Sequence, residues 1–339
     1  MLRPGDVVEV RSAAEILATL DGDAATDAMP FMPEMLQHAG RRFTVSRRAE
    51  KICDTVSGGP PRSLRMRDTV LLDGLRCDGS AHSGCQAGCL FYWKESWLRR
   101  VDAESELEDH DELENRDLDP RDRLEALARE ATRVVDELDG EPAEKYSCQA
   151  TQTLRASEPL NNYDPRPFVR ELTAGNVGPL RLLRVVARAV SGPILRRLRL
   201  LSWHPIQRQS EPLPTRGDLN LQPGDTVEVR SKEEIARTID GKGKTRGLWF
   251  DWEMVPYCGG RYRVRDRVER IIDERTGRMI EIGSDCLILD NVVCSGECST
   301  GHWLCPRASY PYWREAWLRR VDGVDPSVTR GSPVDATTP

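Results

Sequence analysis

The sequence predicts a mostly β chain, α+β overall, in which two duplicated small barrels, each with a metal site, are joined by a helical middle segment. Three observations support this fold class. A segment near residue 2 returns near residue 221, both copies alternate apolar and polar residues, and both copies gather three cysteines and one histidine in a short stretch. A chain of 339 residues is long enough for two or three domains.

The duplication is visible in an alignment without gaps. With a constant offset of 219, residues 4–54 and 223–273 are identical at 24 of 51 positions. The match returns near the end, where YWKESWLRRVD at 92–102 corresponds to YWREAWLRRVD at 312–322. These matches place repeat 1 at 1–102 and repeat 2 at 219–323, and they predict the same elements in both copies.

Each repeat is predicted to consist mainly of short strands. After a Pro-Gly turn, DVVEVRS and DTVEVRS alternate apolar and polar residues with a period of two. The next segment, SAAEILATLDG or SKEEIARTIDG, has an N-cap serine, a glutamate three residues later and a closing glycine, which predicts one short helix. The alternation resumes in RRFTVSRRAEKICD and DTVLLDGLRC, with counterparts in the second copy, and WLRRVD suits a closing strand.

This order of elements, from Pro-Gly-Asp through several short strands to a late Leu-Arg-x-Val strand, resembles small SH3-like barrels of the KOW type. The resemblance implies one such barrel in each repeat and allows contact with nucleic acid. The duplicated arrangement also resembles a family of duplicated bacterial proteins, a resemblance that implies no particular activity.

The cysteine clusters are the strongest chemical signal in the sequence. Cys77 follows LLDGLR as Cys294 follows ILDNVV, and Cys85 and Cys305 each lie eight residues before the tryptophan of a Tyr-Trp pair. In chain order the histidine takes a different place in the two clusters. Thiolate and imidazole ligands at such spacing are typical of tetrahedral zinc. We therefore expect two zinc sites, whose ligands are Cys77, His82, Cys85 and Cys89 in repeat 1, and Cys294, Cys298, His302 and Cys305 in repeat 2.

Other interpretations of the clusters stay open at this stage. CDGSAH at 77–82 resembles the CDGSH iron–sulfur signature, with one additional residue before the histidine and no upstream Cys-x-Cys. That resemblance implies a [2Fe–2S] cluster as the alternative cofactor. The thiols could also be buried packing groups or disulfides, and a catalytic metal with an open coordination position is a further alternative.

The remaining polar residues give little support for an active site. Cys53 and Cys258 are not shared between the repeats, and Cys148 lies outside both. The shared carboxylates Glu34 and Glu253 are interpreted as turn caps or arginine partners, in preference to a pair facing each other across a cleft. No phosphate-binding glycine loop or nucleophile elbow is present in the sequence. Whether the protein is an enzyme is left open.

The middle of the chain changes sign along its length. Residues 101–144 carry a net charge of −13, which predicts an acidic linker at 103–118. The helical middle segment, 119–218, is expected to begin with a helix capped by Asp119, with a helical stripe formed by Leu124, Leu127, Ala128, Ala131, Val134, Val135 and Leu138. A basic amphipathic arm follows at 179–203, broken at Gly192-Pro193, with Leu180, Leu183, Val186, Ala187 and Val190 on its apolar face.

These features favour a non-catalytic scaffold in which two zinc-stabilised barrels dock a protein partner, with peripheral membrane contact through 179–203 as a further option. The alternative is a metal-dependent enzyme or redox protein using a Cys₃His site, and a third is a KOW-like protein that binds nucleic acid. The start of the chain shows no secretory signal, so a cytoplasmic location is expected. Residues 324–339 are expected to be a disordered tail, and the oligomeric state is not predicted.

Overall fold

The computed structural model describes residues 1–58, 62–101, 119–138, 141–161, 164–197, 219–299 and 302–321, and side chains throughout these ranges except at 137–138, 141–143 and 193–196. The expected acidic linker, the expected tail and the end of the arm, 198–203, lie outside them. The chain divides into two compact units. Unit 1 contains Met1–Leu182 and Ile272–Ile280, and unit 2 contains Leu183–Ile271 and Glu281–Pro339.

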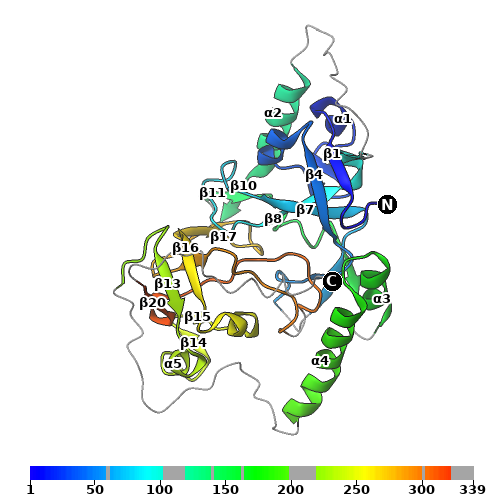
Figure 1. Cartoon of the computed structure of the whole chain (residues 1–339). Coiled ribbons are helices and arrows are strands. Elements are labelled where there is room, and N and C mark those ends of the chain that lie inside the picture. Colours follow the sequence, from blue (N-terminus) through cyan, green and yellow to red (C-terminus); the bar gives the residue numbers. More distant parts are fainter. Residues whose placement is uncertain are drawn as a thin grey trace. The chain divides into compact units, whose positions relative to one another are not determined.

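Repeat 1 is built on a five-stranded antiparallel sheet with the order β8-β7-β4-β1-β9 (Figure 1). Smaller pairings join β2 to β3 and β5 to β6. Its elements are β1 (Val7–Val10), α1 (Ala13–Leu17), β2 (Ala25–Thr26), β3 (Met29–Pro30), η1 (Pro33–His38), β4 (Arg42–Arg48), β5 (Ile52–Cys53), β6 (Ser63–Arg65), β7 (Thr69–Arg76), β8 (Leu90–Lys94), η2 (Glu95–Trp97) and β9 (Leu98–Arg100).

Local sequence explains the start of this repeat. Gly5 has φ +90°, a left-handed value that suits glycine, and it places the chain for the first strand. Ser12 caps α1 by accepting a hydrogen bond from the backbone N–H of Glu15, while the Glu15 carboxylate accepts one from the backbone of Ser12. This capping box satisfies N–H groups that the first turn of a helix leaves free. The short helix expected after the first strand is therefore confirmed.

Repeat 2 has the sheet order β19-β16-β13-β20, which matches β7-β4-β1-β9. Pairing of β1 with β4 aligns Val7 with Thr44, and pairing of β13 with β16 aligns Thr226 with Arg263, each residue shifted by 219. Its elements are β13 (Thr226–Val229), α5 (Lys232–Ala236), β14 (Lys244–Thr245), β15 (Leu248–Trp249), η3 (Trp252–Tyr257), β16 (Arg261–Arg267), β17 (Arg270–Ile272), β18 (Met279–Glu281), β19 (Leu287–Leu289), η4 (Glu315–Trp317) and β20 (Leu318–Arg320).

The expectation of a mostly β chain is confirmed at the level of class. More residues lie in strands than in helices, and one sheet forms a half-barrel. Both long strands of the repeats, β4 and β16, carry a register shift at the same place, after Val45 and after Val264. Such a bulge bends and twists a strand, which helps a sheet to curl.

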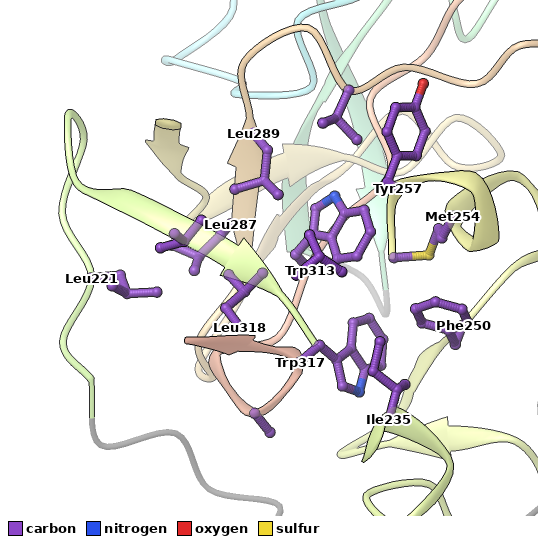
Figure 2. Close-up of a cluster of buried hydrophobic side chains, with 14 of the residues drawn as sticks. Leu221, Ile235, Phe250, Met254, Tyr257, Leu287, Leu289, Trp313, Trp317 and Leu318 are labelled. Carbon is purple, nitrogen blue, oxygen red and sulfur yellow. The ribbon is translucent and has the colours of Figure 1, made fainter. Parts of the chain in front are cut away.

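The core of repeat 2 is an aromatic cluster with aliphatic residues around it (Figure 2). Phe250 contacts Trp317 edge to face, with ring centroids 5.2 Å apart, and it lies at 6.2 Å from Trp313. Edge-to-face contacts of this kind add to the free energy gained by burying the rings. Trp313 and Trp317, four residues apart in the sequence, are therefore packing residues of this core.

The helix expected to run from Asp119 to Leu138 is shorter than predicted. Asp119 does cap α2 (Pro120–Thr132), accepting a hydrogen bond from the Arg121 N–H, but residues 133–138 form strand β10. Strand β10 (Arg133–Leu138) pairs with β11 (Glu141–Tyr146). The physical reason is the pair of β-branched valines at 134–135 followed by an Asp-Gly sequence, which together favour a hairpin over a helix.

The rest of the middle segment holds one strand and two helices. Strand β12 (Glu158–Leu160) pairs with β6, and α3 (Arg166–Thr173) precedes α4 (Pro179–Arg197). The expected break at Gly192-Pro193 is absent, because α4 continues to Arg197. An interior proline removes one backbone N–H from the helix, and the residues up to Arg197 are helical all the same.

The predicted apolar face of α4 is largely exposed. Leu180, Leu183 and Val190 are 78%, 67% and 61% exposed, whereas Val185, which lay outside the predicted stripe, is fully buried. Among the helices in the part of the chain that the structure describes, none is both long enough and apolar enough to cross a bilayer.

Candidate metal centres

Each repeat brings one glutamate, one cysteine and one histidine together. Site 1 is defined as Glu34, Cys77 and His82, and site 2 as Glu253, Cys294 and His302; within each site the ligand atoms all lie within 4.8 Å of one another. The glutamates come from the 3₁₀ helices η1 and η3, and the cysteines follow strand β7 and the strand equivalent to it, β19. The histidines lie in the loops that follow. Two distant segments of each repeat therefore converge on one point.

In site 1 the imidazole of His82 presents one nitrogen to each of the other two residues. Nε2 lies 3.5 Å from Cys77 Sγ, and Nδ1 lies 3.2 Å from Glu34 Oε1. The same carboxylate oxygen accepts a hydrogen bond from the Ala81 N–H at 3.0 Å and lies 3.9 Å from Cys77 Sγ. The side chains of Glu34 and His82 are 1% and 3% exposed.

Burial and close partners shift the pKa values in site 1 in opposite directions. Burial lowers the pKa of His82, but its hydrogen bonds to Cys77, Cys85 and Glu34 raise the pKa by a larger amount, so the net shift is upward. Burial raises the pKa of Glu34, but the His82 contact and the Ala81 N–H lower it overall. Burial raises the pKa of the Cys77 thiol. A buried group of two potential anions with one imidazole favours a bound cation.

The other predicted residues of repeat 1 are placed differently. Cys85 is buried and hydrogen bonds to His82; burial raises its pKa, but this contact and backbone N–H groups lower it overall. One of these N–H groups belongs to Ile272 and lies 3.3 Å from Cys85 Sγ. Cys89 is half-buried, and its carbonyl accepts a hydrogen bond from the Cys77 N–H. Neither the Cys85 thiol nor the Cys89 thiol is a member of the site 1 group, so the role of each as a ligand stays a prediction.

In site 2 both carboxylate oxygens of Glu253 accept hydrogen bonds from the loop that follows β19. One oxygen of Glu253 accepts hydrogen bonds from the N–H groups of Cys298 and Ser299, at 2.7 and 2.9 Å. The other accepts from the N–H and the hydroxyl of Ser295, at 3.0 and 2.7 Å. Cys294 Sγ lies 3.9 Å from His302 Nδ1. Four donors on one buried carboxylate make Glu253 an anchor for this loop.

Burial also affects the three thiols of the repeat 2 cluster. Burial, with the nearby Glu253, raises the pKa of Cys294 well above its usual value. Burial also raises the pKa of Cys298 to about 11, although Arg188 opposes the shift, and Sγ of Cys298 lies 4.0 Å from that guanidinium. Cys305 is buried close enough to Cys294 to influence its pKa. Neither Cys298 nor Cys305 is a member of the site 2 group, and both stay predicted ligands.

A glycine two residues after the first cysteine shapes both loops. Gly79 has φ +76°, and a Cβ there would lie 2.2 Å from the carbonyl oxygen of Cys85. Gly296 has φ +68°, and a Cβ there would lie 2.8 Å from the backbone nitrogen of Cys305. Each Cys-x-Gly segment thus lets the chain fold back onto a later cysteine, Cys85 in repeat 1 and Cys305 in repeat 2. Glycine alone supplies both the left-handed angle and the close backbone approach.

The sequence reasoning missed the two glutamates as parts of the sites. The available signal was that Glu34 and Glu253 are related by the offset of 219, but both were interpreted as turn caps or arginine partners. It also misplaced the histidines: counted back from Trp93 and Trp313, His82 and His302 both lie at the eleventh residue, so their positions correspond. Chain order hid this because the loop from Cys294 to His302 is three residues longer than the loop from Cys77 to His82.

All ten cysteines are free thiols in the structure. Buried thiol and imidazole groups with a carboxylate beside them form a donor set that suits a divalent transition metal, zinc above all, once the thiols lose their protons to the metal. Comparison with known proteins adds no further assignment: no protein-family model matches the chain, and neither the curated proteins nor the solved structures include a significant match.

Proposed function

We propose that the protein is a non-catalytic, zinc-binding scaffold in which each repeat is a small SH3-like barrel stabilised by one zinc ion. The observation that carries the proposal is the recurrence of the same three residue types at corresponding positions of the two repeats, converging in both. A duplicated chain inherits such a group in both copies, but each copy has kept it although only 24 of the 51 aligned positions at 4–54 and 223–273 are identical.

A structural role for the metal follows from what the loops lack. Between β7 and β8 the chain has no strand or helix, and site 1 is buried although its loop is built from turns. Zinc in a closed shell supplies folding free energy directly, which small barrels with little core require. A bound cation also offsets the cost of burying Glu34 beside a cysteine.

Metal analysis of the purified chain tests the proposal. We expect two zinc ions per chain, no visible absorption, and loss of folded structure on chelation. Cys77→Ser and Cys294→Ser should each remove one zinc, whereas Cys258→Ser, in a half-buried thiol outside both sites, should retain both. Visible charge-transfer bands with stoichiometric iron would favour the iron–sulfur alternative, and loss of activity before loss of fold would favour a metal-dependent enzyme.

The partner surface in this proposal is helix α4. Its exposed Leu180, Leu183 and Val190 share one helix with Arg181 and Arg184, and no acidic residue occurs between Pro179 and Arg197. Apolar and cationic side chains on one exposed helix suit an anionic membrane surface or an acidic protein partner. We place the protein in the cytoplasm, where reduced cysteines persist as metal ligands.

A further inference from the structure

We propose that Glu34, and not Cys89, completes the ligand set of site 1, which is then Glu34, Cys77, His82 and Cys85. This inference rests on the proposed zinc-binding function. It changes the chemistry of the site from three sulfurs and one nitrogen to two sulfurs, one nitrogen and one oxygen.

The first support is the geometry of the three residues already in contact. A tetrahedral zinc with bond lengths of about 2.0 to 2.3 Å separates neighbouring ligand atoms by about 3.3 to 3.7 Å. In site 1 Glu34 Oε1 lies 3.2 Å from His82 Nδ1 and 3.9 Å from Cys77 Sγ, and one ligand atom of each residue lies within 4.8 Å of the other two. The 3.5 Å separation from Cys77 Sγ involves Nε2, the other nitrogen of the ring, so it does not measure the same ligand set. The carboxylate therefore lies at ligand distance from both partners. Cys85 supplies the second sulfur, since it hydrogen bonds to the same imidazole.

The second support is a buried oxygen without a partner. Glu34 Oε2 is fully buried and makes no hydrogen bond within the part of the chain that the structure describes. An unsatisfied carboxylate oxygen in a buried site is costly, and a metal ion would remove that cost. Glu253 gives the matched comparison, because both of its oxygens already accept two hydrogen bonds from its own loop. Site 1 thus has a free carboxylate oxygen where site 2 has none.

The third support is the correspondence between repeats. The Cys77 N–H donates to the carbonyl of Cys89, and the Cys294 N–H donates to the carbonyl of Ser309, both at 2.8 Å. Cys89 and Ser309 therefore occupy the same backbone position. Serine is not a zinc ligand of choice, so this position is not needed for a site of this design. The residues found at corresponding positions in both copies are the glutamate, the first cysteine, the histidine, and the cysteine eight residues before the tryptophan, which is Cys85 or Cys305.

The test compares Cys89→Ser with Glu34→Gln in the full chain loaded with zinc. X-ray absorption gives the mean number of sulfur ligands per metal, and competition with a chromophoric chelator gives the affinity. We expect Cys89→Ser to keep two zinc ions and an unchanged sulfur count. Glu34→Gln should weaken zinc binding at one of the two sites by about 100-fold or more. Loss of an outer-shell partner alone costs up to about 100-fold in affinity, and loss of a direct ligand should cost at least as much.

Two results overturn the inference while leaving the proposed function intact. One is a fall of about half a sulfur per metal in Cys89→Ser, which is the loss of one thiolate at one of two sites. The other is a folded Glu34→Gln variant with two zinc ions of unchanged affinity. If Glu34→Gln does not fold, the sulfur count of Cys89→Ser decides alone. Absence of bound metal from the wild-type chain would defeat the proposed function itself.

Discussion

The indole N–H of Trp317 donates to the hydroxyl of Thr238, with 3.1 Å between Nε1 and Oγ1, and lies 3.0 Å from the hydroxyl of Thr245. Repeat 1 contains the same arrangement, in which Trp97 reaches Thr19 and Thr26, each at 3.1 Å. A buried tryptophan needs a partner for its N–H group, and both repeats supply it from the same two positions. Each tryptophan is thereby fixed in one orientation at the end of its core.

We expect Trp317→Phe to lower the free energy of unfolding by about 2 to 3 kcal/mol. The change leaves a small cavity and removes the donor that two buried threonine hydroxyls share. Unfolding in denaturant, followed by circular dichroism, measures the loss. Trp249→Phe is the matched control, because Trp249 is 40% exposed and its replacement should be close to neutral. Equal stabilities of the two variants would show that the buried hydrogen bonds contribute nothing.

The turn at Gly79 should be more sensitive to a methyl group than the turn at Gly84. Both glycines have left-handed angles, φ +76° and φ +73°, so alanine strains either position by about 1 to 2 kcal/mol. At Gly79 the new Cβ would also collide with the backbone of Cys85, whereas at Gly84 nothing lies within 4 Å. We expect Gly79→Ala, and not Gly84→Ala, to weaken zinc binding at site 1. Chelator competition measures both, and equal affinities would contradict the proposed role of the Cys-x-Gly segment.

Glu171 should make the fold less stable as the pH rises. Burial raises the pKa of this carboxyl from 4.5 to about 8, even though Asn176 donates a hydrogen bond to it. Between these two values the folded state keeps a proton that the unfolded state releases. The contribution of Glu171 to the free energy of unfolding is therefore fully present below about pH 4.5. It falls by about 1.4 kcal/mol per pH unit above that value, until the pH reaches the pKa of the folded state.

Glu171→Gln should remove that part of the pH dependence. The amide keeps the shape of the side chain and carries no titratable proton, so the variant should be more stable than the wild type at pH 7.5 and similar to it at pH 4.5. Urea unfolding at the two pH values measures the difference. Parallel pH profiles for the two proteins would show that Glu171 is ionised in the folded state.

Helix α4 should carry the protein to anionic membranes. We expect the wild type to float with vesicles containing phosphatidylserine and to stay behind with neutral vesicles. Leu183→Glu with Val190→Glu should abolish flotation at unchanged stability, because these side chains are 67% and 61% exposed. Ile280→Glu, at a 43% exposed position outside the helix, is the control and should float as the wild type does. Wild-type protein that ignores anionic vesicles would leave an acidic protein as the partner of this surface.

Part of this protein can be read from local pattern alone. The offset of 219 predicted elements at the same positions in both copies, and Ser12 with Glu15 predicted the capped first helix. Both depend on residues near one another in sequence, where backbone geometry and hydrogen-bond reach decide the outcome. The mostly β class follows in the same way, from alternation along single strands.

Features that depend on competition between structures were less predictable. The apolar spacing around Val134 fits a helix as well as a strand, and pairing with β11 decided in favour of the strand. The apolar face of α4 was predicted as a stripe, but its exposure depends on what else packs nearby, and Val185 is buried in place of Leu183. Periodicity gives the shape of an element, and neighbours decide which side is covered.

The candidate metal centres divide along the same line. Cysteine and histidine spacing predicted a candidate metal site in the loop after each β7-type strand, because those residues are close in sequence. Glu34 lies 43 residues before Cys77, and only the packing of η1 against that loop brings the carboxylate to the imidazole of His82. Sequence distance carries no information about such a contact. The sequence therefore determined which thiols and imidazoles are available as ligands. The tertiary structure decided which side chains come into contact, because buried polar groups need hydrogen-bond or ionic partners, and those partners can come from distant parts of the chain.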